Sequence, residues 1–219
     1  MIVQRPSPNH NSRPAGGAID MLVLHYTGMR TAEEALARLC DPAAKVSAHY
    51  VIDEDGTVSA LVAEGRRAWH AGVAYWARQR DINACSIGIE LVNPGHEFGY
   101  RAFPGAQLAA LETLCLEILA RHPIPPHRVL GHSDVAPARK ADPGELFDWA
   151  RLARAGIGLW PEPGRGEGDL ARFGYDTSEG AHAAHAATAF QRHWRPGRID
   201  GVMDDECRAL LAGLLDLLP

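Results

Sequence analysis

This sequence of 219 residues lacks long apolar runs, clusters of basic residues and closely spaced cysteines, and each absence excludes a class of protein. No apolar run approaches the roughly 20 residues that a membrane-spanning helix needs. Lysine and arginine form no cluster that would neutralise phosphates, and the formal net charge is −5, so nucleic acid is not expected as a partner. The four cysteines are scattered without CxxC spacing, which favours buried free thiols over disulfides.

The beginning of the sequence, residues 1–19, is interrupted by prolines and glycines and shows neither a secretory signal nor a lipid-anchor motif. Together with the free thiols, this favours the cytoplasm. A leader removed from the sequence would instead be compatible with the periplasm. No transmembrane segment is predicted in either case.

Hydrophobic periodicity predicts strands that alternate with helices. The apolar run 19–24 is typical of a buried strand, and Thr31 with Glu34 forms a capping box before a short amphipathic helix. Further elements follow in this order: a helix over 32–39, a hairpin of 47–52 and 57–62 around the turn 53–56, a strand over 86–92, and a helix over 107–121.

This order of elements predicts an α/β fold with a mixed central β-sheet flanked by helices, followed by a small three-helix domain. We expect the first domain to cover residues 1–156 and a Gly- and Pro-rich linker to cover 157–168. The second domain, 169–219, contains helices near 169–173, 179–194 and 204–218. Three short helices bury little surface by themselves, so this domain should pack against the larger one.

His25, His132 and Asp142 stand where three metal-ligand side chains can converge. His25 follows the strand at 19–24 and His132 follows the apolar run 128–131, so both imidazoles are expected at the carboxyl edge of the sheet. The loop after His132 delivers Asp142. A catalytic zinc typically takes three such ligands and leaves a position where the pKa of water falls to about 7. The pattern predicts a zinc hydrolase, although no HExxH motif is present.

Glu90 and Lys140 add reacting groups to this arrangement. Glu90 alternates with apolar residues in the strand 86–92, and partial burial would raise the pKa of its carboxyl group and suit it to general acid/base catalysis. Lys140 stands two residues before Asp142 and would stabilise an oxyanion.

Structural roles are open for the same residues. His25 could be a hydrogen-bonded residue at a strand end, and Glu90 could form a salt bridge with an arginine. Asp142 precedes Pro-Gly and suits a turn or a helix cap, while Lys140 could be a solvated surface charge.

Other histidines have simpler interpretations. His49, Trp69 and His70 could be core residues with polar tips. His182 and His185 lie three apart in a predicted helix, where an exposed helix face is favoured over a metal site.

Five segments match the motifs of one enzyme family in the same order along the chain: 24–27, 47–52 with Asp55-Gly56, 68–72, Asn83 with 86–91, and 131–144. Together they resemble the zinc-dependent N-acetylmuramoyl-L-alanine amidases of the type-2 amidase, or peptidoglycan-recognition-protein-like, superfamily. The resemblance runs from about residue 21 to 149. Residues 173–176, 189–191 and 200–204 also resemble the small helical peptidoglycan-binding domains often joined to such amidases.

The resemblance implies that His25, His132 and Asp142 bind Zn²⁺, that Glu90 is the catalytic acid/base, and that Lys140 stabilises the developing charge. Further positions match the family near its substrate groove and are predicted to bind substrate: His49, Arg67, Trp69, His70 and Asn83.

The implied reaction is hydrolysis of the amide between N-acetylmuramic acid and the L-alanine of the stem peptide. Some relatives with the helical domain are outer-membrane lipoproteins, and this sequence lacks their leader. We therefore expect soluble muropeptides, including anhydro-muropeptides, as substrates in cell-wall recycling. Alternatives are a non-catalytic peptidoglycan-recognition module and a wall-tethered scaffold with weak activity.

Overall fold

The structure is a computed structural model that describes residues 2–178 and 180–219. Its centre is a six-stranded sheet with the order β1-β5-β4-β7-β3-β8. Strands β4, β7, β3 and β8 run parallel, whereas β5 is antiparallel to β4. The bounds of the six strands are β1 Ile2–Gln4, β3 Met21–Tyr26, β4 Tyr50–Ile52, β5 Val58–Ala60, β7 Ser86–Leu91 and β8 Val129–Gly131. The predicted mixed central sheet is confirmed.

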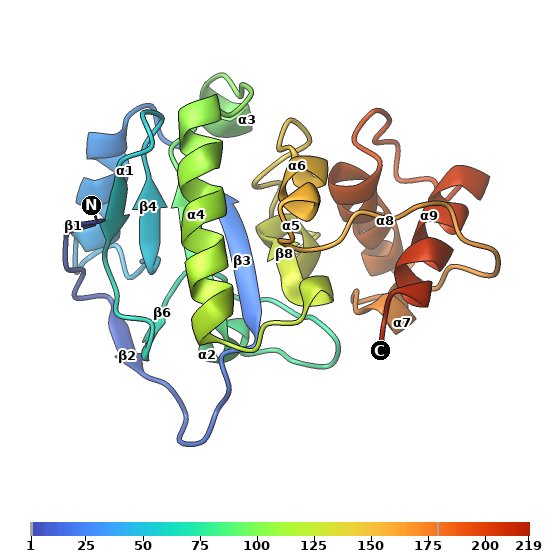
Figure 1. Ribbon diagram of the computed structural model, residues 1–219, viewed down its shortest axis with the longest axis horizontal. Helices are drawn as coiled ribbons and strands as arrows, with labels where there is room; N and C mark the ends of the chain where they lie inside the picture. Colours follow the sequence, from blue (N-terminus) through green and yellow to red (C-terminus); the bar gives the residue numbers. More distant parts are fainter. Residues whose placement is uncertain (1, 179) are drawn as a thin grey trace.

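Helices flank this sheet, and a separate antiparallel pair joins β2 (His10–Ser12) to β6 (Arg66–Ala68). Figure 1 shows α4 lying across one face of the sheet, and α7, α8 and α9 beside its β8 end. The bounds of the helices are α1 Ala32–Cys40, α2 Ile82–Cys85, α3 Gly95–Phe98, α4 Gly105–Arg121, α5 His132–Val135, α6 Trp149–Arg154, α7 Leu170–Phe173, α8 Gly180–Trp194 and α9 Asp205–Asp216, with a 3₁₀ turn at Pro126–Arg128.

Local sequence rules account for the predicted hairpin and the first helix. In the hairpin, Gly56 adopts φ +90°, and Ala106 O would lie 2.9 Å from a β-carbon there. At the start of α1, the Thr31 hydroxyl accepts from the amide of Glu34, as the capping box predicts. The returning bond differs, because the Glu34 carboxylate accepts from the amide of Arg30 instead of Thr31.

The two faces of the sheet have different surroundings because side chains alternate along each strand. Leu22 and Leu24 of β3 join the apolar cluster under α4, and Ile87, Ile89 and Leu91 of β7 do the same. Met21 and Val23 belong to the cluster on the opposite face. By this alternation, His25 and Glu90 lie on the face away from α4, where the register pairs them directly.

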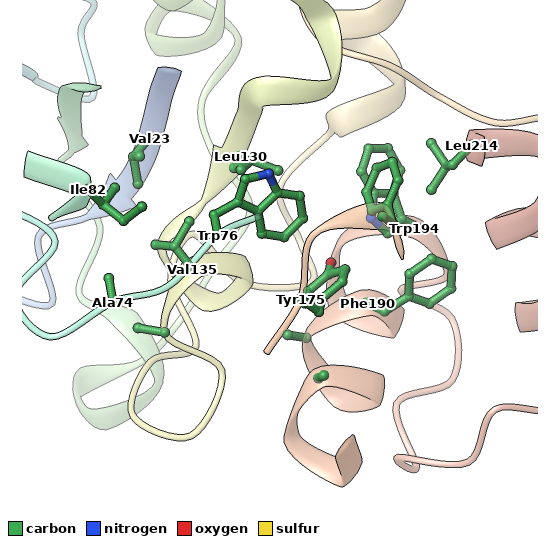
Figure 2. Packing of buried hydrophobic residues seen from close by; sticks show 14 of the residues in the cluster. Val23, Ala74, Trp76, Ile82, Leu130, Val135, Tyr175, Phe190, Trp194 and Leu214 are labelled. Atoms are coloured by element: carbon green, nitrogen blue, oxygen red, sulfur yellow. The ribbon is translucent and has the colours of Figure 1, made fainter. Parts of the chain in front are cut away.

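The carboxyl-terminal helices share this second cluster with the sheet. Figure 2 shows Trp76 between the sheet side, with Val23 and Leu130, and Tyr175 and Phe190 of the terminal region. The rings of Trp76 and Tyr175 meet edge to face, with centroids 4.8 Å apart. The three helices therefore pack against the larger part of the chain as expected, while the domain boundaries stay a prediction.

Caps define the starts of two of these terminal helices. Asp169 caps α7 by accepting from Ala171 N, and Asp204 caps α9 by accepting from Cys207 N. Both starts agree with the predicted ranges. The start predicted for α8 at Glu179 lies outside the described residues.

All four cysteines are free thiols, but only Cys115 and Cys207 are buried, whereas Cys40 and Cys85 are partly exposed. The expectation of burial was therefore wrong for two of them. Across 2–178 and 180–219, none of the helices has the length and apolarity to span a membrane.

Candidate metal centre and active-site cavity

Three buried side chains from separate parts of the chain meet at one point. Nδ1 of His25 lies 2.9 Å from Nδ1 of His132 and 3.0 Å from Oδ2 of Asp142. Nδ1 of His132 lies 3.0 Å from the same carboxylate oxygen. These three residues form a group that could hold a metal ion.

The local backbone explains why the three side chains meet. His25 lies at the carboxyl end of the interior strand β3, and His132 begins α5 directly after the neighbouring edge strand β8. The loop after α5 turns back because the amide of Ser133 donates to the carbonyl oxygen of Asp142 at 2.9 Å. The parallel strands thus bring both imidazoles to one edge, and the loop adds the carboxylate.

Burial and mutual charge set the protonation of this group. Burial, reinforced by His132, lowers the pKa of His25 to about 4. Burial alone would raise the pKa of Asp142, but the two adjacent imidazoles outweigh it and hold that pKa well below its usual value. A deprotonated carboxylate beside a neutral imidazole is the state in which these side chains bind a cation.

Glu90 lies beside this group with a desolvated carboxyl group. Its Oε2 is buried and has no hydrogen-bond partner within 2–178 and 180–219. Burial, and then the charge of Asp142, raise the pKa of Glu90 well above its usual value, although Lys140 opposes them. No arginine pairs with Glu90 among the described residues, so the salt-bridge alternative finds no support.

A cavity of about 560 Å³ opens over these residues. Glu90, Lys140, His132 and Asp142 line it, so the predicted reacting groups face one space. Lys140 is exposed on the rim, where its ammonium group can reach a bound molecule. Other wall residues that the sequence alone did not indicate are Tyr26, Thr27, Gly28, Met29, Ala35, Arg38, Leu39, Val46, Ser47, Glu97, Arg139 and Ala141.

The predicted substrate-binding residues divide into two groups. Trp69 and His70 line the cavity. His49 is fully buried, with Nδ1 accepting from the amide of Gly88 and Nε2 next to the carbonyl of Arg66.

Arg67 and Asn83 also have protein partners. Arg67 pairs with Asp81 at 2.6 Å, and the Asn83 side chain accepts from the amides of His70 and Ala71. Neither residue, nor His49, is part of the cavity wall. The assignment of all five residues to substrate binding stays a prediction.

Two hydrogen-bonding residues next to the metal-ligand candidates were not found from the sequence. Ser86 lies behind His70, and Asp134 lies in α5 two residues after His132. The sequence offered one indication for each. Ser86 is a small polar residue at the start of a buried strand, and Asp134 is an acidic residue in the first turn after His132.

A mixed sheet that brings two histidines and an aspartate together beside a desolvated glutamate, under one open cavity, is consistent with a hydrolase that has a metal site. Residues 15–145 match Amidase_2, the family described as N-acetylmuramoyl-L-alanine amidase, and the chain belongs to this family. The enzyme class predicted from the sequence is confirmed: the chain is an amidase that cleaves the bond between N-acetylmuramic acid and L-alanine.

Relatives extend the similarity over nearly the whole chain. N-acetylmuramoyl-L-alanine amidase AmiD of Escherichia coli is 36% identical, covering 90% of this chain and 83% of AmiD. Its complex with anhydro-N-acetylmuramic acid-L-Ala-D-gamma-Glu-L-Lys superposes with a TM-score of 0.82 at 35% identity, covering 93% of this chain and 92% of that one.

Two further relatives are similar to this chain. AmpDh3 of Pseudomonas aeruginosa also gives a TM-score of 0.82, at 36% identity and with 94% of both chains covered. The 1,6-anhydro-N-acetylmuramyl-L-alanine amidase AmpD of Haemophilus influenzae is 32% identical, covering 68% of this chain and 88% of AmpD.

Proposed function

We propose that this amidase uses Zn²⁺, held by His25, His132 and Asp142, to hydrolyse soluble muropeptides, including those with an anhydro sugar. The donor set supports zinc, which binds imidazole nitrogen and carboxylate oxygen at about 2.0–2.2 Å. Tetrahedral ligands at those distances lie about 3.3–3.6 Å from one another. The three donor atoms here are separated by 2.9 to 3.0 Å, so a small outward shift would fit the ion.

The surroundings of the donors also fit a cation. The other ring nitrogen of His132, Nε2, lies 3.0 Å from the carbonyl of Ala71 and must donate to it, which in the neutral imidazole leaves Nδ1 without a proton. Bound Zn²⁺ supplies a Lewis acid that polarises a carbonyl and acidifies water.

Glu90 is the group that moves the proton. Its carboxylate takes a proton from the attacking water while the water oxygen bonds to the lactyl carbonyl carbon. The same proton then passes to the nitrogen of L-alanine as the carbon–nitrogen bond breaks, which yields a free lactyl acid and a peptide amine. The raised pKa of Glu90 suits both transfers near neutral pH.

Lys140 stabilises the negative charge that builds on the carbonyl oxygen. Its ammonium group lies at the rim of the cavity that Glu90 also lines. The Lys140 ammonium is a compact charge on a long stem, so it can approach the carbonyl oxygen on which negative charge develops.

Relatives support the inclusion of anhydro-muropeptides among the substrates. AmiD of E. coli and AmpDh3 of P. aeruginosa were both crystallised with anhydro-muramic peptides. Purified anhydro-muropeptide and its reduced N-acetylmuramic counterpart should both lose the stem peptide when incubated with the zinc-loaded enzyme, as followed by mass spectrometry. Chelation should stop cleavage, and added Zn²⁺ should restore it. Intact substrate after incubation with the zinc-loaded enzyme would refute the proposal.

We also propose that the reaction takes place in the cytoplasm, on wall fragments returned for recycling. The experiment is fractionation of cells that produce the native chain, with detection by antibody. Recovery in the periplasmic or membrane fraction would refute the cytoplasmic location and support the alternative.

A further inference from the structure

A chain of hydrogen bonds joins Ser86, His70 and His25, and a backbone carbonyl determines which group donates in each of them. The hydroxyl oxygen of Ser86 lies 2.6 Å from the carbonyl oxygen of Ile82, and a carbonyl can only accept. The single hydroxyl proton of Ser86 is therefore committed to Ile82. The same hydroxyl oxygen lies 3.1 Å from Nε2 of His70 and is left with lone pairs on that side.

The donor role of Ser86 toward Ile82 also fixes which ring nitrogens of His70 and His25 carry a proton. Because Ser86 must accept, Nε2 of His70 carries a proton and donates it. In the neutral imidazole, Nδ1 of His70 is then an acceptor, and it lies 3.0 Å from Nε2 of His25. His25 must donate from Nε2, which leaves its Nδ1 lone pair directed at His132 and Asp142.

The imidazole of His70 packs against strand β7 at a position without a side chain. A β-carbon at position 88 would lie 2.4 Å from the ring of His70, so Gly88 of β7 is the residue that admits the ring. His70 is 8% exposed and Ser86 is fully buried. The amides of His70 and Ala71 both donate to the Asn83 side chain, which fixes the backbone from which the ring projects.

We infer that His70 and Ser86 are positioning residues of the metal centre, which fix the proton of His25 on Nε2 and so keep Nδ1 available for the ion. This inference rests on the proposed zinc site and assigns His70 a role behind the ligand in addition to its place in the cavity wall. With Ala71 acting on His132, one short segment, residues 70–71, sets the tautomer of both histidine ligands.

Zinc affinity tests the inference without reference to activity. Competition with a chromophoric chelator should give Ser86→Ala a zinc dissociation constant about 10- to 100-fold above wild type, the usual range for loss of such a partner. His70→Leu should show at least the same loss. His70→Asn can present an amide oxygen where Nδ1 accepts, so it should recover part of the affinity.

Ser7→Ala is the matched control. Ser7 is also buried, and its hydroxyl also donates to a backbone carbonyl at 2.6 Å, that of Leu39, but it is not part of the cavity wall. Its zinc affinity should equal that of wild type. An unchanged affinity for Ser86→Ala and His70→Leu, in a wild type that binds zinc, would overturn the inference and leave the proposed function intact. A wild type that binds no zinc would overturn both.

A measurement on the wild type avoids any dependence on variant folding. Nitrogen-15 correlation spectra of the histidine rings in the zinc-loaded enzyme should show the proton of His70 on Nε2 and an unprotonated Nδ1. A proton on Nδ1 of His70 would reverse the direction of the chain and refute the inference.

Discussion

The hydroxyl of Tyr175 donates a 2.6 Å hydrogen bond to Oδ1 of Asp134, two residues after the metal-ligand candidate His132. The second oxygen of Asp134 lies 2.7 Å from the amide of Gly131 and 2.7 Å from Nδ1 of His193. All three side chains are buried. The carboxyl-terminal region thereby holds the short helix that begins with His132.

Replacing Tyr175 with phenylalanine should destabilise the protein. The buried carboxylate of Asp134 would lose one donor, which costs about 1–3 kcal/mol of unfolding free energy. Denaturant unfolding followed by circular dichroism measures this difference. Tyr75→Phe is the control, because the Tyr75 side chain is partly exposed and should lose little. Equal unfolding midpoints for both variants would show that the bond to Asp134 adds no stability.

Glu90→Gln should separate metal binding from catalysis. The amide keeps the size of the side chain but cannot carry a proton between water and the leaving nitrogen, so kcat should fall by about 10²- to 10⁴-fold. Zinc content, measured by atomic emission on the dialysed protein, should equal that of wild type. Turnover near the wild-type rate would remove Glu90 from its assigned role.

Lys140→Ala should lower kcat by about 10²- to 10³-fold, because a charged group that acts on the oxyanion is lost. Steady-state kinetics on a soluble muropeptide would measure the effect. Lys45→Ala removes the same charge from an exposed site that is not part of the cavity wall, so its kcat should stay unchanged. A similar decrease in both variants would indicate a general effect of charge.

Glu64 should make stability depend on acid pH. Burial opposes its ionisation, but hydrogen bonds from Arg121, His122 and Tyr50 outweigh burial and hold the pKa of Glu64 at about 2, below its usual 4.5. The folded-state pKa is depressed, so the carboxylate contributes its full stabilisation above pH 4.5. That contribution is lost as the pH falls toward 2.

The matching experiment compares wild type with Glu64→Gln in urea at a series of pH values. Wild type should be the more stable protein at neutral pH, and its advantage should shrink steadily below about pH 4.5. An advantage that stays constant down to about pH 2.5 would mean that Glu64 titrates as a free carboxyl group.

The sequence predicted the convergence of the metal-ligand candidates because strand periodicity is a local property. Glu90 alternates with apolar neighbours, which assigns it to the face opposite the one that those neighbours cover, under α4. His25 directly follows an apolar run, which predicts its position at the carboxyl edge of the sheet. His132 likewise follows a short apolar run, which predicts it at the same edge of the sheet. Their joint role as a zinc site came from the resemblance of the surrounding motifs to an enzyme family.

Other elements depend on partners far along the chain, and local patterns could not reveal them. Strand β1, with exposed side chains, exists because it pairs with β5, and β2 exists because it pairs with β6. The bonds from Ser86 to His70 and from Tyr175 to Asp134 likewise join residues that are neighbours only after folding. Short strands and single hydrogen bonds of this kind leave little trace in composition.

The packing around Trp76 has a consequence for protein engineering. Its ring contacts Phe173 and Tyr175, and a β-carbon at Gly174 would lie 2.6 Å from it, so the indole fits a surface made by the last third of the chain. A chimera that grafted an unrelated targeting module after residue 168 would leave that indole facing water. We therefore expect the catalytic part of this amidase to lose stability when it is transplanted without its own carboxyl-terminal helices.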